Sequence, residues 1–193
     1  MGSWMMKPLA VACLAGAIAV FGSLDCGGST GSGGAGNFGS CSRNADCMVR
    51  PQSCCGTCGA ATRDDMIAIN RANVSAYRQA ECANAVCLAC SMPQDPNLLA
   101  TCNGAQCALV DLLAEPLTAC TSGSDCRIRT NECCECGGKT DREHLIAVRN
   151  SSEETFHKLF CDPVTSCAEC LPTYPPEATA ACDNNRCIVK YSK

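Results

Sequence analysis

The sequence predicts a small, disulfide-rich α+β fold that occurs twice in the chain, each copy with one helix on a short antiparallel sheet. Cysteine accounts for 22 of the 193 residues, which exceeds the roughly 8–10% that is typical of disulfide scaffolds. Six aromatic residues follow position 26, so each copy can bury little apolar surface, and covalent cross-links are the expected substitute. The cysteines also repeat at a near-constant distance along the chain, which indicates two domains of similar fold.

The repeat consists of two sets of ten cysteines, whose corresponding members lie 78 to 80 residues apart. The first set is Cys41, Cys47, Cys54, Cys55, Cys58, Cys82, Cys87, Cys90, Cys102 and Cys107, and the second is Cys120, Cys126, Cys133, Cys134, Cys136, Cys161, Cys167, Cys170, Cys182 and Cys187. Ten matched positions indicate an internal tandem duplication. The predicted organisation is a first repeat at 41–110, a linker at 111–119 that contains Pro116, and a second repeat at 120–193.

Each repeat begins with a short β-prone segment, CMVR at 47–50 and CRIR at 126–129. Each closes with two cysteines around a turn, NG at 103–104 and NN at 184–185. Asn and Gly tolerate positive φ and suit tight hairpins. We expect the strand after each turn to pair with the early strand of the same repeat.

A helix is predicted between these strands in each repeat. Thr62 and Thr140 are good N-caps, and Glu143, three places after Thr140, completes a capping box. The apolar residues that follow lie near one helical face. They are Met66, Ile69, Val74 and Tyr77 in the first repeat and Leu145, Val148, Phe156 and Leu159 in the second.

Zinc binding and redox catalysis are two alternatives for the cysteines. The pairs at 55–58 and 87–90 could supply four thiolates to a tetrahedral zinc ion. In the second repeat, however, the first pair becomes Cys134-x-Cys136, a poorer chelate. The stretches CGTC (55–58), CLAC (87–90) and CAEC (167–170) fit the Cys-x-x-Cys pattern of thiol–disulfide oxidoreductases, but the βαβ context that makes this pattern strong is missing.

Disulfide bonding is the interpretation we favour. An even, duplicated set of twenty cysteines predicts ten bridges, five within each repeat, and no resident metal or cofactor. Adjacent cysteines such as Cys54 and Cys55 are expected to reach two different partners, because a bond between neighbours strains the backbone.

The N-terminus has the pattern of an export signal. Residues 1–25 contain one basic residue, Lys7, followed by an apolar run at 9–24. A run of about 16 residues is marginal for a spanning helix, which needs roughly 20. Residues 26–40 are rich in glycine and serine, which predicts a flexible tether.

A hydrophobic leader, a cysteine and a flexible tether resemble the N-terminus of bacterial lipoproteins. The resemblance covers the first 40 residues and implies that Cys26 carries the lipid anchor. Ser23 and Asp25 stand where that family has leucine and a small residue. The alternative is ordinary cleavage of the leader and secretion.

A second resemblance concerns the start of each repeat. The spacing Cys-x5-Cys-x6-Cys-Cys-x2-Cys, with Asp46 before the second cysteine, resembles half of a whey-acidic-protein four-disulfide core over about 18 residues. Some members of that family inhibit proteases, so protease inhibition is a further alternative.

Composition argues against several functional classes. A net charge of -4 without a basic stripe argues against nucleic-acid binding. The sequence lacks a shared histidine, a Gly-x-Ser-x-Gly motif and a phosphate-binding loop. We therefore predict a non-enzymatic, monomeric protein with a structural or binding role towards an unknown protein or envelope component.

The predicted location is the cell envelope, in the outer membrane or periplasm, or the medium if Cys26 is not lipidated.

Overall fold

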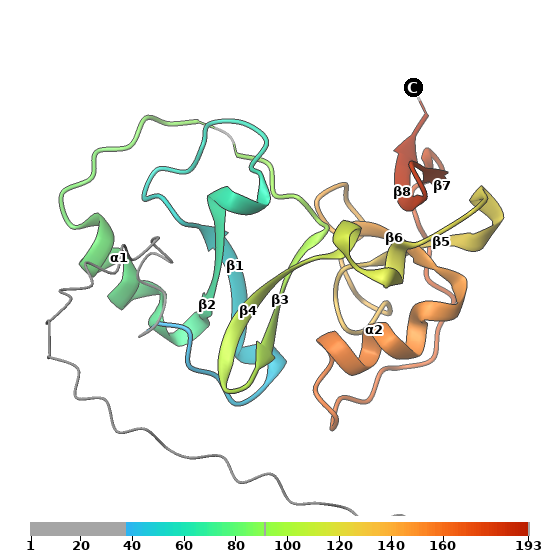
Figure 1. Cartoon of the computed structure of the whole chain (residues 1–193), viewed down its shortest axis with the longest axis horizontal. Coiled ribbons are helices and arrows are strands. Elements are labelled where there is room, and N and C mark those ends of the chain that lie inside the picture. The colour runs from blue at the N-terminus through green and yellow to red at the C-terminus, as the bar shows by residue number, and fades with distance from the viewer. Residues whose placement is uncertain (1–37, 91, 193) are drawn as a thin grey trace, which may run out of the picture. The chain divides into compact units, whose positions relative to one another are not determined.

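The computed structural model describes residues 38–90 and 92–192 (Figure 1). The predicted leader and Cys26 lie outside these residues. The strands and helices of the first half are β1 (Cys47–Pro51), β2 (Met66–Asn70), α1 (Val74–Cys82), β3 (Leu98–Asn103) and β4 (Gln106–Asp111). Those of the second half are β5 (Cys126–Thr130), β6 (Leu145–Arg149), α2 (Glu153–Phe160), β7 (Ala178–Asp183) and β8 (Arg186–Tyr191).

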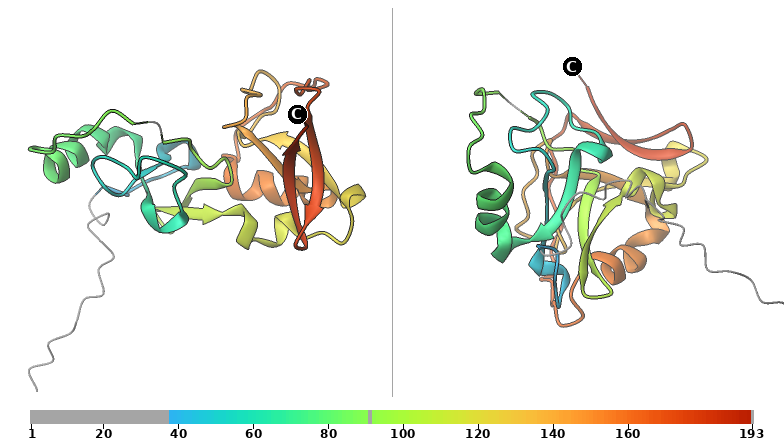
Figure 2. Two further views of the ribbon diagram at one scale, coloured as in Figure 1. Left: turned by 90° about the horizontal axis from the view of Figure 1, so that it is seen from above. Right: turned by 60° about the vertical axis from the view of Figure 1, so that its left-hand side comes forward.

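Four two-stranded antiparallel sheets make up the β structure, in the pairs β1–β2, β3–β4, β5–β6 and β7–β8. Each half therefore runs strand, strand, helix, hairpin. Figure 2 shows the second half from two further sides, with the β7–β8 hairpin beside β5 and β6. A small, disulfide-rich α+β fold is confirmed, although each half holds two small sheets instead of one. None of the helices in the described ranges is long and apolar enough to cross a membrane.

The predicted helix is wrong in its first part, because β2 and β6 occupy that stretch. β2 pairs with β1 from Cys47↔Asn70 to Pro51↔Met66, so the early strand does not pair with the last strand as expected. The sequences MIAIN and LIAVR contain β-branched residues that suit a pleated, half-buried surface. The helices that remain are short, nine residues in α1 and eight in α2.

The predicted caps have other roles. Thr62 does form a reciprocal capping box, but with Asp65 across a 3-10 turn that leads into β2. In the second half, residues 142–144 form a turn before β6. The capping box of Thr140 and Glu143 is therefore also wrong, because no α-helix begins there.

The two closing hairpins are confirmed. Asn184 and Asn185 have φ of 49° and 61°, which makes the NN pair the turn of the β7–β8 hairpin. In the first half, Gly104 and Ala105 have φ of 57° and 66°, so the turn lies one residue later than the NG pair. Positive φ at both central positions matches the right-handed twist of hairpin strands.

Ten disulfides connect the described cysteines, five in each half. In the first half they are Cys41–Cys102, Cys47–Cys107, Cys54–Cys82, Cys55–Cys87 and Cys58–Cys90. In the second they are Cys120–Cys182, Cys126–Cys187, Cys133–Cys161, Cys134–Cys167 and Cys136–Cys170. The two sets have the same connectivity, and adjacent cysteines reach different partners.

The end of the predicted tether is bound to the first half. The ring of Phe38 meets that of Tyr77 edge-on, with the centroids 5.5 Å apart. The Gly39 carbonyl accepts a hydrogen bond of 2.7 Å from the Cys107 amide, and Ser40 bridges to Gln106. Residues 38–40, which the prediction assigned to the tether, therefore pack against the first half.

The predicted linker at 111–119 is largely packed. It forms two 3-10 turns, and its Leu112 and Leu117 are 0% and 2% exposed. Both pack with Ile146 and Phe156 in the core of the second half. Leu117 and Phe156 thus repeat the contact of Phe38 and Tyr77, 79 positions further along the chain.

Candidate functional site

A linked cluster of ion pairs lies in the second half, around β5 and α2. Arg127 and Arg129 alternate along β5, so their side chains project from one face of the strand. Glu153 opens α2, where a carboxylate is favourable at the helix N-terminus. Glu135 and Tyr174 complete the cluster from the loops before β6 and β7.

Arg129 is the buried centre of this cluster, with 0% of its side chain exposed. Its Nη1 donates to Glu153 Oε1 at 2.7 Å, and its Nε donates to the Thr130 carbonyl at 2.9 Å. Nη2 donates to the carbonyls of Glu132 and Cys133. Burial lowers the pKa of Arg129, and Glu153 opposes that shift. A buried charge persists only when it is paired in this way.

Arg127 joins the two carboxylates. It donates to Glu135 Oε2 at 2.6 Å and to Glu153 Oε2 at 3.2 Å. The Tyr174 hydroxyl donates to Glu135 Oε1. Burial, and then this hydrogen bond, raise the pKa of Tyr174 well above its usual range. The phenol therefore stays protonated and acts as a donor.

His157 extends the cluster to sulfur. Its Nε2 lies 3.1 Å from Glu153 Oε1, and its Nδ1 lies 3.2 Å from the Sγ of Cys161. The three residues follow one another at intervals of four, so α2 and its end place them in a row. A cavity of about 220 Å³ opens here, lined by Glu135, Glu153, His157 and Cys133 among others.

The first half does not repeat this cluster. Met48 and Val74 stand where the second half has Arg127 and Glu153, and Arg78 stands in the place of His157. Arg50, the counterpart of Arg129, is buried, and its Nε has no hydrogen-bond partner among the described residues. Burial and the charge of Arg78 both lower the pKa of Arg50.

A second hollow, of about 580 Å³, lies between the two halves. Its walls include Met48 and Val49 of β1, Leu99 of β3, and Phe160 from the end of α2. His144, which the sequence placed in the second repeat without a counterpart, also lines it. The walls are mixed in character, with apolar side chains beside polar ones.

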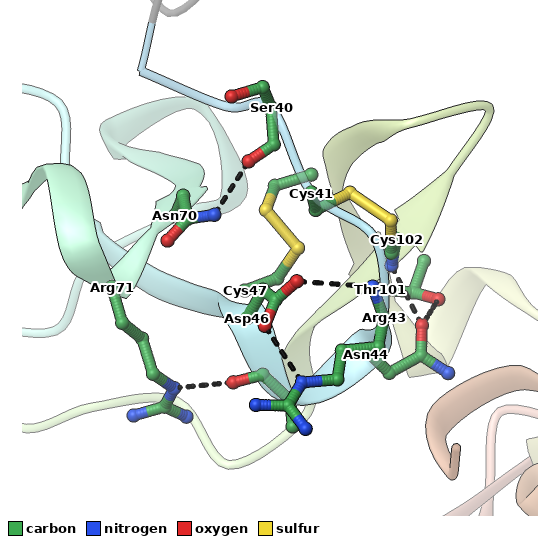
Figure 3. Close-up of a disulfide and its surroundings, with 12 residues drawn as sticks. Ser40, Cys41, Arg43, Asn44, Asp46, Cys47, Asn70, Arg71, Thr101 and Cys102 are labelled. Atoms are coloured by element: carbon green, nitrogen blue, oxygen red, sulfur yellow. Dashed lines mark hydrogen bonds and ion pairs between the residues drawn. A yellow bond between two sulfur atoms is a disulfide. The ribbon is translucent and has the colours of Figure 1, made fainter.

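Asn44 holds the halves together at this hollow. Its backbone amide donates to Asp162 Oδ1 at 2.6 Å, and its Nδ2 donates to the Leu159 carbonyl at 3.0 Å. Its Oδ1 accepts from Thr101 Oγ1 and from the Cys102 amide, both at 2.8 Å. Figure 3 shows Asn44 beside Thr101 and Cys102, next to the Cys41–Cys102 bridge.

The structure uses the Cys-x-x-Cys cysteines as partners in long-range bridges. Cys55 is bonded to Cys87 and Cys58 to Cys90, so the four sulfurs are engaged in two disulfides and are not zinc-binding thiolates. Neither pair is closed within its own motif, as a thioredoxin-type site would require. Cys26, the predicted lipid anchor, lies outside the described residues.

Sequence reasoning missed the arginine–glutamate cluster. The residues involved span 127 to 174 and have no fixed spacing, so no motif marks them. One signal was available: both histidines, His144 and His157, occur in the second repeat opposite Asp65 and Arg78 of the first. Comparison with known families, curated proteins and solved structures finds no match.

Proposed function

We propose that the protein is a non-enzymatic, disulfide-stapled binding module of the cell envelope. The observation that carries this proposal is the pairing of all twenty described cysteines in ten disulfides. Disulfides persist in oxidising compartments and are rare in reducing cytosol. This favours a location outside the cytoplasm.

Attachment through Cys26 is the finer part of the proposal. The Gly/Ser-rich segment after Cys26 has little use in a freely diffusing protein, but it suits one fixed at its N-terminus. Because the folded part includes Phe38, 11 residues separate the two. At ~5–6 Å × √n, they would hold the first half about 18 Å from the attachment point. Three acyl chains on Cys26 would give stable membrane residence, where one chain is marginal.

The tandem arrangement also belongs to the proposal. Equal bridge connectivity and the paired contacts Phe38–Tyr77 and Leu117–Phe156 support an origin by duplication. The hollow between the halves is a candidate concave surface for a partner, since both halves contribute side chains to it. Its mixed lining suits a segment of another envelope protein.

Detergent phase partitioning tests the anchor. Wild type is expected in the detergent phase with a blocked N-terminus, and Cys26→Ser in the aqueous phase. Ser23→Ala is the matched control, since it alters the leader and keeps the cysteine. A wild-type protein that stays in the aqueous phase with a free N-terminus shows that the protein is secreted and not anchored.

A separate experiment tests the binding role. Purified envelope fractions are passed over immobilised wild type, over Leu99→Lys in the hollow, and over Leu171→Lys, which changes an exposed residue that does not line it. The proposal expects one protein to be retained by wild type and Leu171→Lys and lost with Leu99→Lys. Equal retention by all three would remove the hollow as the binding surface.

A further inference from the structure

We infer that the Cys133–Cys161 disulfide is a thiol-exchange site, at which an external thiolate attacks Cys133 and His157 protonates the sulfur of Cys161. The substrate class is a small thiol or an exposed cysteine of another protein. This inference does not depend on the lipid anchor or on the binding role proposed above, and it adds a redox reaction to a protein that is otherwise proposed to be non-enzymatic.

The two sulfurs of this bridge have unequal surroundings. Cys133 is half-buried and lines both hollows described above, so a thiol that enters either one comes next to this residue. Cys161 is 8% exposed and follows the last turn of α2. Exchange requires access to the attacked sulfur, whereas the leaving sulfur needs stabilisation of its negative charge. We therefore expect a thiolate to attack Cys133, with Cys161 as the leaving sulfur.

His157 lies at the leaving sulfur. Its Nδ1 is 3.2 Å from Cys161 Sγ, which carries no proton in the disulfide and can only accept. Its Nε2 is 3.1 Å from Glu153 Oε1, which is also an acceptor. An imidazolium, with both nitrogens protonated, can donate to both at once. Glu153 thus positions the ring, and His157 holds a proton at the atom where charge develops.

The exchange step balances with a thiol as the only co-reactant. The thiolate forms a bond to Cys133 Sγ as the Cys133–Cys161 bond breaks, and the electron pair of that bond goes to Cys161 Sγ. The imidazolium gives its Nδ1 proton to this sulfur and becomes neutral. A second thiolate then attacks the external sulfur of the mixed disulfide, releasing an oxidised thiol pair and the Cys133 thiolate.

The charges around His157 come from several elements. Glu153 belongs to its own helix, and Arg129 of β5 shares Oε1 of that carboxylate. Glu135 and Glu169 line the same cavity from the loops. The neighbouring Cys134–Cys167 bridge also faces the site, with both of its sulfurs within 4.8 Å of Cys133 Sγ. Two of the three carboxylates, Glu135 and Glu153, are paired with Arg127 and Arg129, so charges of both signs lie around the histidine. The second bridge lies close to the attacked sulfur.

The first half provides an internal comparison. Its equivalent bridge, Cys54–Cys82, has Arg78 in the position of His157 and Val74 in that of Glu153. Arginine does not release its proton in proteins. The Cys54–Cys82 bridge therefore has the same place in the fold without a proton donor at the leaving sulfur.

The experiment exposes the folded, oxidised protein to glutathione at neutral pH. The reaction is quenched with acid and alkylated while less than one bridge per molecule has opened. At this stage the second thiolate has not yet freed the Cys133 sulfur, so Cys133 cannot attack Cys134–Cys167. We expect glutathione on Cys133 and the alkyl label on Cys161, at a rate about tenfold above that of Cys54–Cys82. First opening of another bridge, or glutathione on Cys161, would overturn the inference.

Two variants separate the chemistry from structural effects. His157→Gln should slow the opening of Cys133–Cys161 about tenfold and leave Cys54–Cys82 unchanged, whereas Arg78→Gln should leave Cys133–Cys161 unchanged. When the wild-type rate is divided by thiolate concentration, it should fall as pH rises, because a general acid must keep its proton to act. The same profile should be flat for His157→Gln. An unchanged rate or profile in that variant would refute the role of His157.

Discussion

The guanidinium carbon of Arg129 lies 3.5 Å from the centroid of the Phe156 ring. The equivalent pair in the first half, Arg50 and Tyr77, is separated by 5.2 Å. In both halves, therefore, an arginine of the first strand (β1 or β5) lies over a buried aromatic ring of the helix (α1 or α2). They differ in what balances the charge, because Glu153 pairs with Arg129 and Val74 occupies the same place beside Arg50. This difference leads to the first prediction.

Replacing Arg129 by methionine is expected to destabilise the protein by about 2 kcal/mol or more, because the buried side chain loses its hydrogen bonds to Glu153 and to three backbone carbonyls. The same change at Arg50 should be close to neutral or stabilising, since an under-paired buried charge is replaced by apolar volume. Chemical unfolding of the oxidised protein measures both. Equal losses in the two variants would contradict the assignment of the ion pair as the cause.

Removing the start of the folded part should reveal the true domain boundary. A chain that begins at residue 38 is expected to unfold at the same temperature as the full chain. A chain that begins at residue 41 should unfold earlier, because it loses the Phe38 ring and the hydrogen bond from the Cys107 amide to Gly39.

The midpoints of thermal unfolding of the two truncated chains are compared. Leu117 occupies the position in the second half that Phe38 occupies in the first, and Leu117→Ala should lower the free energy of unfolding by about 2–5 kcal/mol. If both truncated chains melt together, residues 38–40 contribute nothing and the contact is incidental.

The free energy of unfolding should fall in acid, because two aspartates at equivalent positions of the two halves become protonated. Hydrogen bonds lower the pKa of Asp46 to about 2, and the bond from the Ser42 amide has the largest effect. The pKa of Asp125 is lowered to about 2 in the same way, mainly by the bond from the Thr121 amide. Because these folded-state values lie below the usual 3.8, each carboxylate stabilises the fold fully above about pH 4 and loses this effect as pH falls towards 2.

Unfolding midpoints measured between pH 5 and 2 test this expectation. The double variant Asp46→Asn/Asp125→Asn should have a lower unfolding midpoint than wild type at pH 5. Below pH 4, its midpoint should also change less with pH than that of wild type. Asp64→Asn serves as a control on an exposed aspartate within the 3-10 turn Arg63–Asp65. Parallel curves for wild type and the double variant would show that other groups cause the acid sensitivity.

The bridges should all lie within one half or the other, as the structure places them. Protease digestion of the non-reduced protein, followed by mass spectrometry, should find no free thiols in residues 41–193 and no peptide that joins the halves. Replacing Cys47 and Cys107 by serine is expected to cost about 2–5 kcal/mol, because their bridge closes a long loop. More than two alkylatable thiols per denatured chain would instead favour a metal or redox role for the cysteines.

The sequence alone determined the cysteine framework and the fold class, because ten matched spacings and a scarcity of large apolar residues leave few other ways to stabilise such a chain. It also determined the hairpin at Asn184–Asn185, whose turn chemistry is local. It did not decide whether MIAIN at 66–70 is helix or strand, since its four consecutive apolar residues satisfy both periodicities. That choice was made by pairing with β1, a contact between distant segments.

The tertiary structure also decided which groups face one another. Arg129, Glu153 and His157 are unremarkable along the chain, and they form a cluster because β5 and α2 bring them within hydrogen-bonding distance. The same holds for His157 and the Cys133–Cys161 bridge. Spacing shows how many bridges a cysteine set can form, but the chemical surroundings of each sulfur depend on side chains supplied from elsewhere in the sequence by packing.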